Sequence, residues 1–248
     1  MTSMPLILLR SLLFAFAFYS ASVIHVLTAL ALTPFGTGPL YRIVQSWSST
    51  HRFLCRWLLG QKVVVEGSLP EGQHFYVVKH ESMFETIDIL QLVALPAIVA
   101  KQELLDIPGW GRLAARFGMI GLKRATGAAA LRHLQRQTRI VLESGRSLCL
   151  FPEGTRAPHG EHPPLKAGFA AMYQLLRLPV VPIAVDSGRV SPRNSFLKRP
   201  GIITYRIGEI IPPGLPRAQA EERAHAAINA LNPPAAAAQA GDGHSPPA

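Results

Sequence analysis

Phe75-Tyr76-Val77-Val78-Lys79-His80-Glu81-Ser82-Met83-Phe84-Glu85-Thr86 is the stretch that decides the fold. It begins with a short apolar run, Phe75 to Val78, of the length and composition of a buried strand. Ser82 to Glu85 then has the S-x-x-E form of a capping box, which begins a helix. The stretch therefore predicts a strand, a polar turn and a helix in immediate succession.

This arrangement puts His80 just outside the helix and Glu85 in its first turn. On one continuous helix, residues five apart lie about 140° apart around the axis and could not act together. From the preceding loop, the chain can fold back so that the carboxylate meets the imidazole. Such a carboxylate fixes the tautomer, and the other ring nitrogen can then take a proton from a hydroxyl. The alternative is that Glu85 only caps the helix and His80 is an ordinary loop histidine.

Composition narrows the class of protein. The 248 residues suit a single domain with a real core. A formal charge of +10 favours an anionic partner, namely nucleic acid, anionic lipid or a phosphorylated substrate. The positive mean hydropathy favours the membrane over nucleic acid. Cys55 and Cys149 lack metal-ligand spacing, so we expect free thiols in a reducing compartment.

The N-terminal region is apolar over residues 5 to 32, and Ser11 to Leu32 is about long enough to cross a bilayer as a helix. A cleaved signal peptide is one alternative, and a shallow membrane-embedded helix is another. We favour a retained anchor. Residues 40 to 59 then predict an amphipathic helix, suited either to a lipid surface or to ordinary core packing. Its basic residues predict that the globular part faces the cytoplasm.

From Lys62 onward, strands and helices alternate, which predicts an α/β fold with a largely parallel central sheet flanked by helices. The tail after Asn232 is rich in Pro, Ala and Gly and is expected to be disordered. The predicted strands are 62–66, 74–79, 97–101, 118–122, 147–151, 179–185 and 202–207. The predicted helices are 83–93, 109–116, 127–144, 167–176 and 217–231.

Cationic side chains follow several of these strands. The segment Phe151 to Arg156 brings a turn, a hydroxyl and a guanidinium to a strand end, where α/β folds bind their ligands. Arg156 can hold a phosphate with two hydrogen bonds. Lys101 and Arg124 end two further strands. Each charge alone is typical of a solvated surface, but together, beside the His80 strand, they favour a phosphate site.

Several familiar sites are absent from the sequence. It has no phosphate loop, no dinucleotide glycine fingerprint and no G-x-S-x-G nucleophile elbow. Phe84 stands where a zincin would have its second histidine, so we expect no metal. Ser82 could act as a nucleophile, but helix capping already accounts for it.

Four segments, in this order, resemble the motifs of the PlsC-type glycerolipid acyltransferases. The segments are His80 with Glu85, Gly118 to Arg124, Phe151 to Arg156, and Val181 to Ile183. The second segment departs from the family pattern, because it has Leu122-Lys123 where Ile-Asp is frequent. The resemblance extends over about residues 62 to 210.

The resemblance implies a membrane-bound α/β acyltransferase whose first motif, His80 and Glu85, is catalytic. With the apolar N-terminus and the composition of the tail, we expect membrane-associated helices over residues 1–60, an acyltransferase domain over 61–232 and a disordered tail over 233–248. The resemblance also implies that the second and third motifs bind the substrate phosphate. The residues expected at that site are Lys101, Arg124, Glu153, Gly154, Thr155 and Arg156.

The function expected from this resemblance is acyl transfer to the sn-2 hydroxyl of lysophosphatidic acid, which gives phosphatidic acid. The acyl donor would be a thioester of acyl carrier protein or coenzyme A, with no further cofactor. The expected partners are membrane lipid and these substrates, not nucleic acid, at the cytoplasmic face of the inner membrane. Alternatives are another acceptor such as a lyso-ornithine lipid or lysophospholipid, a hydrolase using Ser82, and a non-catalytic lipid-binding protein.

Overall fold

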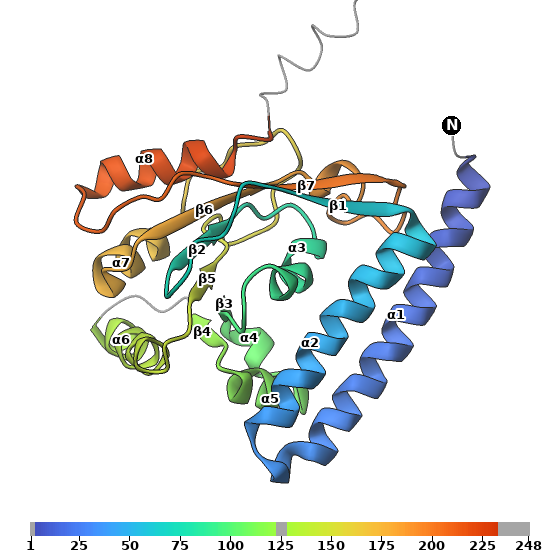
Figure 1. Cartoon of the computed structure of the whole chain (residues 1–248), viewed down its shortest axis with the longest axis horizontal. Coiled ribbons are helices and arrows are strands. Elements are labelled where there is room, and N and C mark those ends of the chain that lie inside the picture. Colours follow the sequence, from blue (N-terminus) through green and yellow to red (C-terminus); the bar gives the residue numbers. More distant parts are fainter. Residues whose placement is uncertain (1–2, 123–127, 233–248) are drawn as a thin grey trace, which may run out of the picture.

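The computed structural model describes residues 3–122 and 128–232 (Figure 1). The described residues contain one sheet of seven strands in the order β1-β7-β6-β2-β5-β3-β4. The tail that was predicted to be disordered lies outside the described residues. The strands are β1 (Gln61–Glu66), β2 (Phe75–Val78), β3 (Ala97–Lys101), β4 (Ile120–Leu122), β5 (Leu148–Leu150), β6 (Val180–Val185) and β7 (Gly201–Ile207).

Five adjacent strands, from β6 to β4, run parallel to one another. β7 pairs antiparallel with β6, and β1 pairs parallel with β7. In the centre, Phe75 of β2 lies opposite Leu148 of β5 and Val180 of β6. The carboxyl ends of the five parallel strands therefore share one edge, and the mostly parallel α/β fold expected from the sequence is confirmed.

Helices cover both faces of the sheet. They are α1 (Met4–Leu32), α2 (Thr37–Leu54), α3 (Phe84–Asp88), α4 (Gln102–Leu105), α5 (Trp110–Phe117), α6 (Ala128–Glu143), α7 (Ala167–Leu176) and α8 (Arg217–Ile228). The helix predicted over 83–93 is divided, since α3 gives way to a 3₁₀ turn at Ile89–Gln91. The short helix α4 has no counterpart in the prediction.

The strand β2 shows how the core is divided. Its side chains alternate, so that Phe75 and Val77 join one apolar cluster and Tyr76 and Val78 join the other. The first cluster lies under α6, α7 and α8, and the second under α1, α2, α3 and α5 (Figure 1). All four residues are buried, which explains why β2 reads as an unbroken apolar run.

The two N-terminal helices form an antiparallel pair beside the sheet (Figure 1). Arg52 of α2 forms a two-pronged ion pair with Asp88 of α3, with distances of 2.7 and 2.6 Å. One face of α2 thus packs on the α/β core. Core packing was one of the two roles that the sequence allowed for residues 40–59. Phe53 of α2 and Trp57, in the helical turn that follows α2, remain exposed. The domain boundary at residue 60 stays a prediction.

Candidate active site

Two neighbouring loops form the centre of the site, one after β2 and one after β5. The His80 backbone N–H donates to Glu153 Oε2 at 2.9 Å, and the Ala157 N–H donates to the His80 carbonyl at 2.7 Å. Because β2 and β5 are adjacent and parallel, both loops leave the sheet at the same edge. These bonds hold the Phe151–Arg156 segment against the histidine.

His80 and Glu85 meet as the folded-back turn requires. His80 Nδ1 lies 2.9 Å from Glu85 Oε1, and the same oxygen accepts the backbone N–H groups of Glu81 and Ser82, both at 2.7 Å. Ser82 Oγ in turn accepts the Phe84 N–H at 2.9 Å. Glu85 therefore caps the turn and contacts the imidazole at once, so the two interpretations from the sequence are not exclusive.

The second oxygen of Glu85 is held by hydroxyl groups. Ser187 Oγ donates to Glu85 Oε2 at 2.6 Å, and Ser82 Oγ donates to it at 3.0 Å. Ser82 is buried and its hydroxyl is engaged on both sides. It is therefore a structural group in this turn, and the geometry gives no support to a hydrolase using Ser82 as nucleophile.

The electrostatics of Glu85 favour an ionised carboxylate. Burial by itself raises the pKa of Glu85, but the hydrogen bonds and charge from His80 and the bonds from Ser187 and Ser82 outweigh it, so the pKa lies below its ordinary value. An ionised Glu85 keeps the proton of the neutral imidazole on Nδ1. Among the described residues, the other ring nitrogen of His80, Nε2, has no hydrogen-bond partner, and the side chain is 17% exposed.

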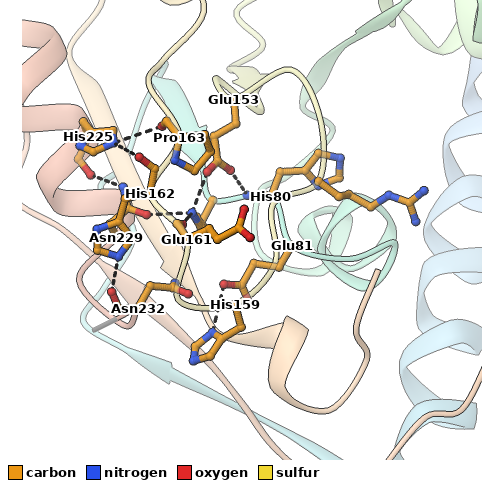
Figure 2. Close-up of polar contacts among 12 residues, drawn as sticks. His80, Glu81, Glu153, His159, Glu161, His162, Pro163, His225, Asn229 and Asn232 are labelled. Atoms are coloured by element: carbon orange, nitrogen blue, oxygen red, sulfur yellow. Dashed lines mark hydrogen bonds and ion pairs between the residues drawn. The ribbon is translucent and has the colours of Figure 1, made fainter. Parts of the chain in front are cut away.

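A buried ion pair supports the loop from below. Lys79 Nζ donates to Glu153 Oε1 at 2.6 Å, to the Glu161 carbonyl at 2.8 Å and to Asn229 Oδ1 at 2.8 Å. Both charged side chains are fully buried. Figure 2 shows Glu153 reaching toward the His80 backbone on one side, with Asn229 on the opposite side of this cluster. Glu153, which we predicted at the substrate, has both oxygens engaged with protein groups and positions the loop.

A second histidine–carboxylate pair lies next to the first. His159 Nδ1 lies 3.1 Å from Glu81 Oε1 (Figure 2). Glu81 Oε2 accepts the Gly188 N–H at 2.7 Å. Burial raises the pKa of Glu81, and the bonds from His159 and Gly188 offset it only in part. This pair ties the loop after Arg156 to the His80 turn.

The residues predicted to bind phosphate are distributed along the same edge. Gly154 and Thr155 are exposed and Arg156 is partly buried. Gly154 has φ of +68°, which favours glycine, and a Cβ there would lie 3.2 Å from Lys166 Cγ. Lys101 is exposed at the end of β3, two strands from β2. Arg124 lies outside the described residues.

Comparison with known proteins identifies the family. A family model described as "Acyltransferase" matches residues 62–186, half of the chain. The chain belongs to the acyltransferase family. The match begins just after the start of β1 and ends just after β6, so it includes the His80 turn and the Phe151–Arg156 loop.

Two relatives of this acyltransferase share the name 1-acyl-sn-glycerol-3-phosphate acyltransferase. The 1-acyl-sn-glycerol-3-phosphate acyltransferase of Pseudomonas aeruginosa is 32% identical over 192 residues, covering 77% of this chain and 72% of the relative. The enzyme of that name from Cocos nucifera is 31% identical over 153 residues, 60% of this chain and 50% of its own length. The crystal structure of the LPA acyltransferase PlsC from Thermotoga maritima matches with a TM-score of 0.69 at 23% identity, covering 96% and 99% of the two chains, which shows a shared fold.

Sequence reasoning missed several residues that position the site of this acyltransferase. Ser187 and Gly188 bind Glu85 and Glu81 from the segment after β6, and Asn229 binds Lys79 from the end of α8. No local pattern marks these residues. Lys79 offered one signal, since a lysine directly after an unbroken apolar strand predicts a buried partner of opposite charge.

Proposed function

We propose that the enzyme transfers a fatty acyl group from a thioester of acyl carrier protein or coenzyme A to the sn-2 hydroxyl of lysophosphatidic acid. The observation that carries this proposal is the His80 imidazole, which is bonded through Nδ1 to a buried, ionised Glu85, while Nε2 has no hydrogen-bond partner in the part of the chain that the structure describes. A general base of this form suits a hydroxyl acceptor. The names of the relatives point to the same acceptor.

In the proposed reaction, Nε2 of His80 takes the proton of the acceptor hydroxyl as its oxygen attacks the thioester carbonyl. The new C–O bond forms, the C–S bond breaks, and the imidazolium returns the proton to the departing thiolate. Glu85 stabilises the imidazolium in between. The hydroxyl itself is the nucleophile, so the reaction needs neither an acyl-enzyme nor a cofactor beyond the thioester.

Arg156, with Lys101 and Arg124, would bind the phosphate of the acceptor. The position of Arg156 supports this role, because the N–H of the next residue, Ala157, is bonded to the His80 carbonyl. A phosphate held there would fix the hydroxyl beside Nε2, and such positioning contributes much of the rate in transfers between two bound substrates. Gly154 and Thr155 would form the exposed part of the same loop.

We also propose that α1 attaches the enzyme to the cytoplasmic face of the inner membrane. Phe14, Phe18 and Ala29 of α1 belong to the protein core, which favours a retained helix over a cleaved signal peptide. The opposite side of α1 exposes large apolar side chains, among them Phe16 at 78% and Ile24 at 63%. A helix with one face on the protein and one apolar face outward is suited to lie in the membrane interface.

The proposed activity is tested with purified enzyme, acyl-thioesters and a panel of acceptors comprising lysophosphatidic acid, lysophospholipids and a lyso-ornithine lipid. Lysophosphatidic acid should be the preferred acceptor, and His80→Ala should lower turnover by about 10²–10⁴-fold with little loss of stability. A strong preference for a different acceptor would overturn the proposed substrate. Wild-type turnover in a folded His80→Ala variant would overturn the mechanism.

The membrane proposal is tested by substitutions rather than truncation, because deleting α1 would expose the core. Phe16→Asp combined with Ile24→Asp should release the enzyme from vesicles at high salt, where residual electrostatic attraction is screened. Val64→Asp combined with Ile202→Asp also introduces two aspartates in place of exposed apolar side chains, on β1 and β7, and should leave the enzyme bound. Equal binding of the two variants would contradict attachment through α1.

A further inference from the structure

The segment from Ser187 to Pro200, which connects β6 to β7, links the site to the N-terminal helix. Its first residues, Ser187 and Gly188, bind the two glutamates of the His80 turn. Near its end, the Lys198 N–H donates to Ser11 Oγ of α1 at 2.9 Å. The segment therefore runs from the catalytic turn to the helix that exposes an apolar face.

This segment also brings two cations to Arg156. Arg193 donates a guanidinium N–H to the Arg156 carbonyl, which holds the end of the Phe151–Arg156 loop. Lys198 is partly buried and donates to the Ser195 carbonyl at 2.9 Å. Burial lowers the pKa of Lys198, and the nearby charge of Arg156 lowers it further. Arg193 therefore contacts the Arg156 main chain, and Lys198 lies near enough to Arg156 for their charges to interact, so the segment gathers two cations around Arg156.

Among the described residues, these three cations have no carboxylate partner. Other arginines such as Arg52 and Arg206 have carboxylate partners. Within residues 3–122 and 128–232, no carboxylate forms an ion pair with Arg156, Arg193 or Lys198. Cations held together in a partly buried place repel one another, and a bound anion relieves both the repulsion and the desolvation.

We propose that Arg193 and Lys198 complete an anion site with Arg156, and that this site binds the phosphate monoester of the acceptor lipid. The inference rests on the proposed function and adds residues outside the four motifs to it. Arg156 adjoins Ala157, whose N–H is bonded to the His80 carbonyl. The three cations therefore lie next to the dyad formed by His80 and Glu85. The bond from Lys198 to Ser11 puts it beside α1, where a lipid could keep its chain on the apolar face.

Three cations suit a monoester better than a diester. A phosphate monoester carries about −1.5 to −2 charges at pH 7, whereas a phosphodiester carries about one. The monoester also has three oxygens to accept hydrogen bonds from guanidinium and ammonium groups. The site should therefore select lysophosphatidic acid over lysophosphatidylglycerol, an anionic lysolipid that can carry the same acyl chain but has a diester headgroup.

Binding without any thioester tests this site directly. Lysophosphatidic acid and lysophosphatidylglycerol are titrated separately in neutral detergent micelles against wild type, Lys198→Ala, Arg193→Ala and Arg199→Ala. Arg199 is the matched control, because it removes an exposed charge of the same segment. Lys198→Ala and Arg193→Ala should each weaken binding of the monoester about tenfold and binding of the diester much less. Arg199→Ala should bind both lipids as wild type does.

Three results would overturn the site: unchanged monoester binding in folded Lys198→Ala, an equal loss for Arg199→Ala, or an equal loss for both lipids. Lys198→Gln, which removes the charge but keeps most of the side chain and a polar end, replaces Lys198→Ala if the latter unfolds. Kinetically, Lys198→Ala should raise the KM for lysophosphatidic acid about tenfold and leave the KM for the thioester unchanged. A wild type that binds the monoester without turnover would overturn the proposed function but leave this site intact.

Discussion

Glu85 binds the imidazole of His80 with the same oxygen that closes the turn between them. The carboxylate is fully buried, and its second oxygen accepts the Ser187 hydroxyl at 2.6 Å. Structure and chemistry therefore depend on one group. The two roles differ in one respect, since closing the turn requires only an acceptor, whereas stabilising an imidazolium requires a negative charge.

Glu85→Gln should separate these roles. Glutamine can still accept from the backbone, because capping boxes use either residue. It lacks the charge, however, and can present its amide donor to His80. We expect turnover to fall at least about 100-fold, while the melting temperature changes much less. Turnover and thermal unfolding are measured on the same preparation.

The control for this change is Glu143→Gln, which alters an exposed ion pair with Arg139 and should leave turnover unchanged. Glu85→Asp keeps the charge on a side chain shorter by one methylene and should give intermediate turnover. Wild-type turnover in Glu85→Gln would show that the residue is only a cap and would leave His80 without its proposed partner.

The meeting of His80 and Glu85 could be predicted because it is local. Five positions separate the two residues, and the apolar strand and capping pattern on either side fix the turn. The alternation of strands and helices was predictable for a similar reason, because hydrophobic periodicity reports directly on which faces are buried.

The supports of the dyad could not be predicted, because they depend on how distant elements pack. Ser187 is 102 positions from Glu85, and Asn229 is 150 positions from Lys79. Both are polar residues at the ends of secondary-structure elements, where a sequence predicts that such side chains are exposed to solvent. The inward orientation of Glu153 could not be predicted for the same reason. Its partner Lys79 is 74 positions away in the sequence, and no residue near Glu153 indicates that the two meet.

Lys79→Met should strongly destabilise the enzyme. It leaves the Glu153 carboxylate buried without its cation, and breaking a buried pair in this way costs about 3–5 kcal/mol. Adding Glu153→Gln should recover part of the loss, because the uncompensated charge is removed. Urea unfolding of both single variants and the double variant gives the coupling energy.

Arg206→Met is the comparison for this loss. Its ion pair with Glu66 is exposed, so the change should cost no more than about 1 kcal/mol. If Lys79→Met costs as little as Arg206→Met, the buried pair is not a structural support of the loop.

His51→Leu should make the free energy of unfolding depend less steeply on pH in the acidic range. His51 is buried against the rings of Phe14, Phe18 and Phe84, and this burial lowers its pKa to about 3. The unfolded chain binds the proton near pH 6.5, so wild type loses stability progressively as the pH falls below that value. Between pH 7 and pH 5, the contribution of His51 is roughly 2 kcal/mol.

The measurement is the free energy of unfolding of wild type and His51→Leu at pH 7, 6 and 5. The difference between the two proteins isolates His51 from the other titrating groups. Phe14→Leu changes the same aromatic cluster without removing a titrating group and should keep the wild-type slope. Parallel curves for wild type and His51→Leu would contradict a neutral, buried histidine.

Ser187→Ala should lower kcat about tenfold and leave both KM values nearly unchanged. The variant removes a hydroxyl that donates to the ionised Glu85, and a hydrogen bond to a charged group contributes about 1.5–3 kcal/mol. Glu85 would keep its contact with His80 but hold it less firmly. Ser191→Ala removes a buried hydroxyl from the same segment, one bonded to Gln61, and should leave kcat unchanged.

The dependence of stability on pH distinguishes a bond to a charged Glu85 from simple packing. Because the folded pKa of Glu85 is lowered, its stabilising contribution is present above the ordinary value of 4.5 and is lost as the pH falls through the folded pKa. Ser187→Ala should therefore be less stable than wild type at pH 7, and the deficit should narrow below pH 4.5 as Glu85 becomes protonated. A deficit that stays the same from pH 7 down to the lowest pH at which both proteins remain folded would mean that Ser187 acts through packing, and the lower kcat would then need another cause.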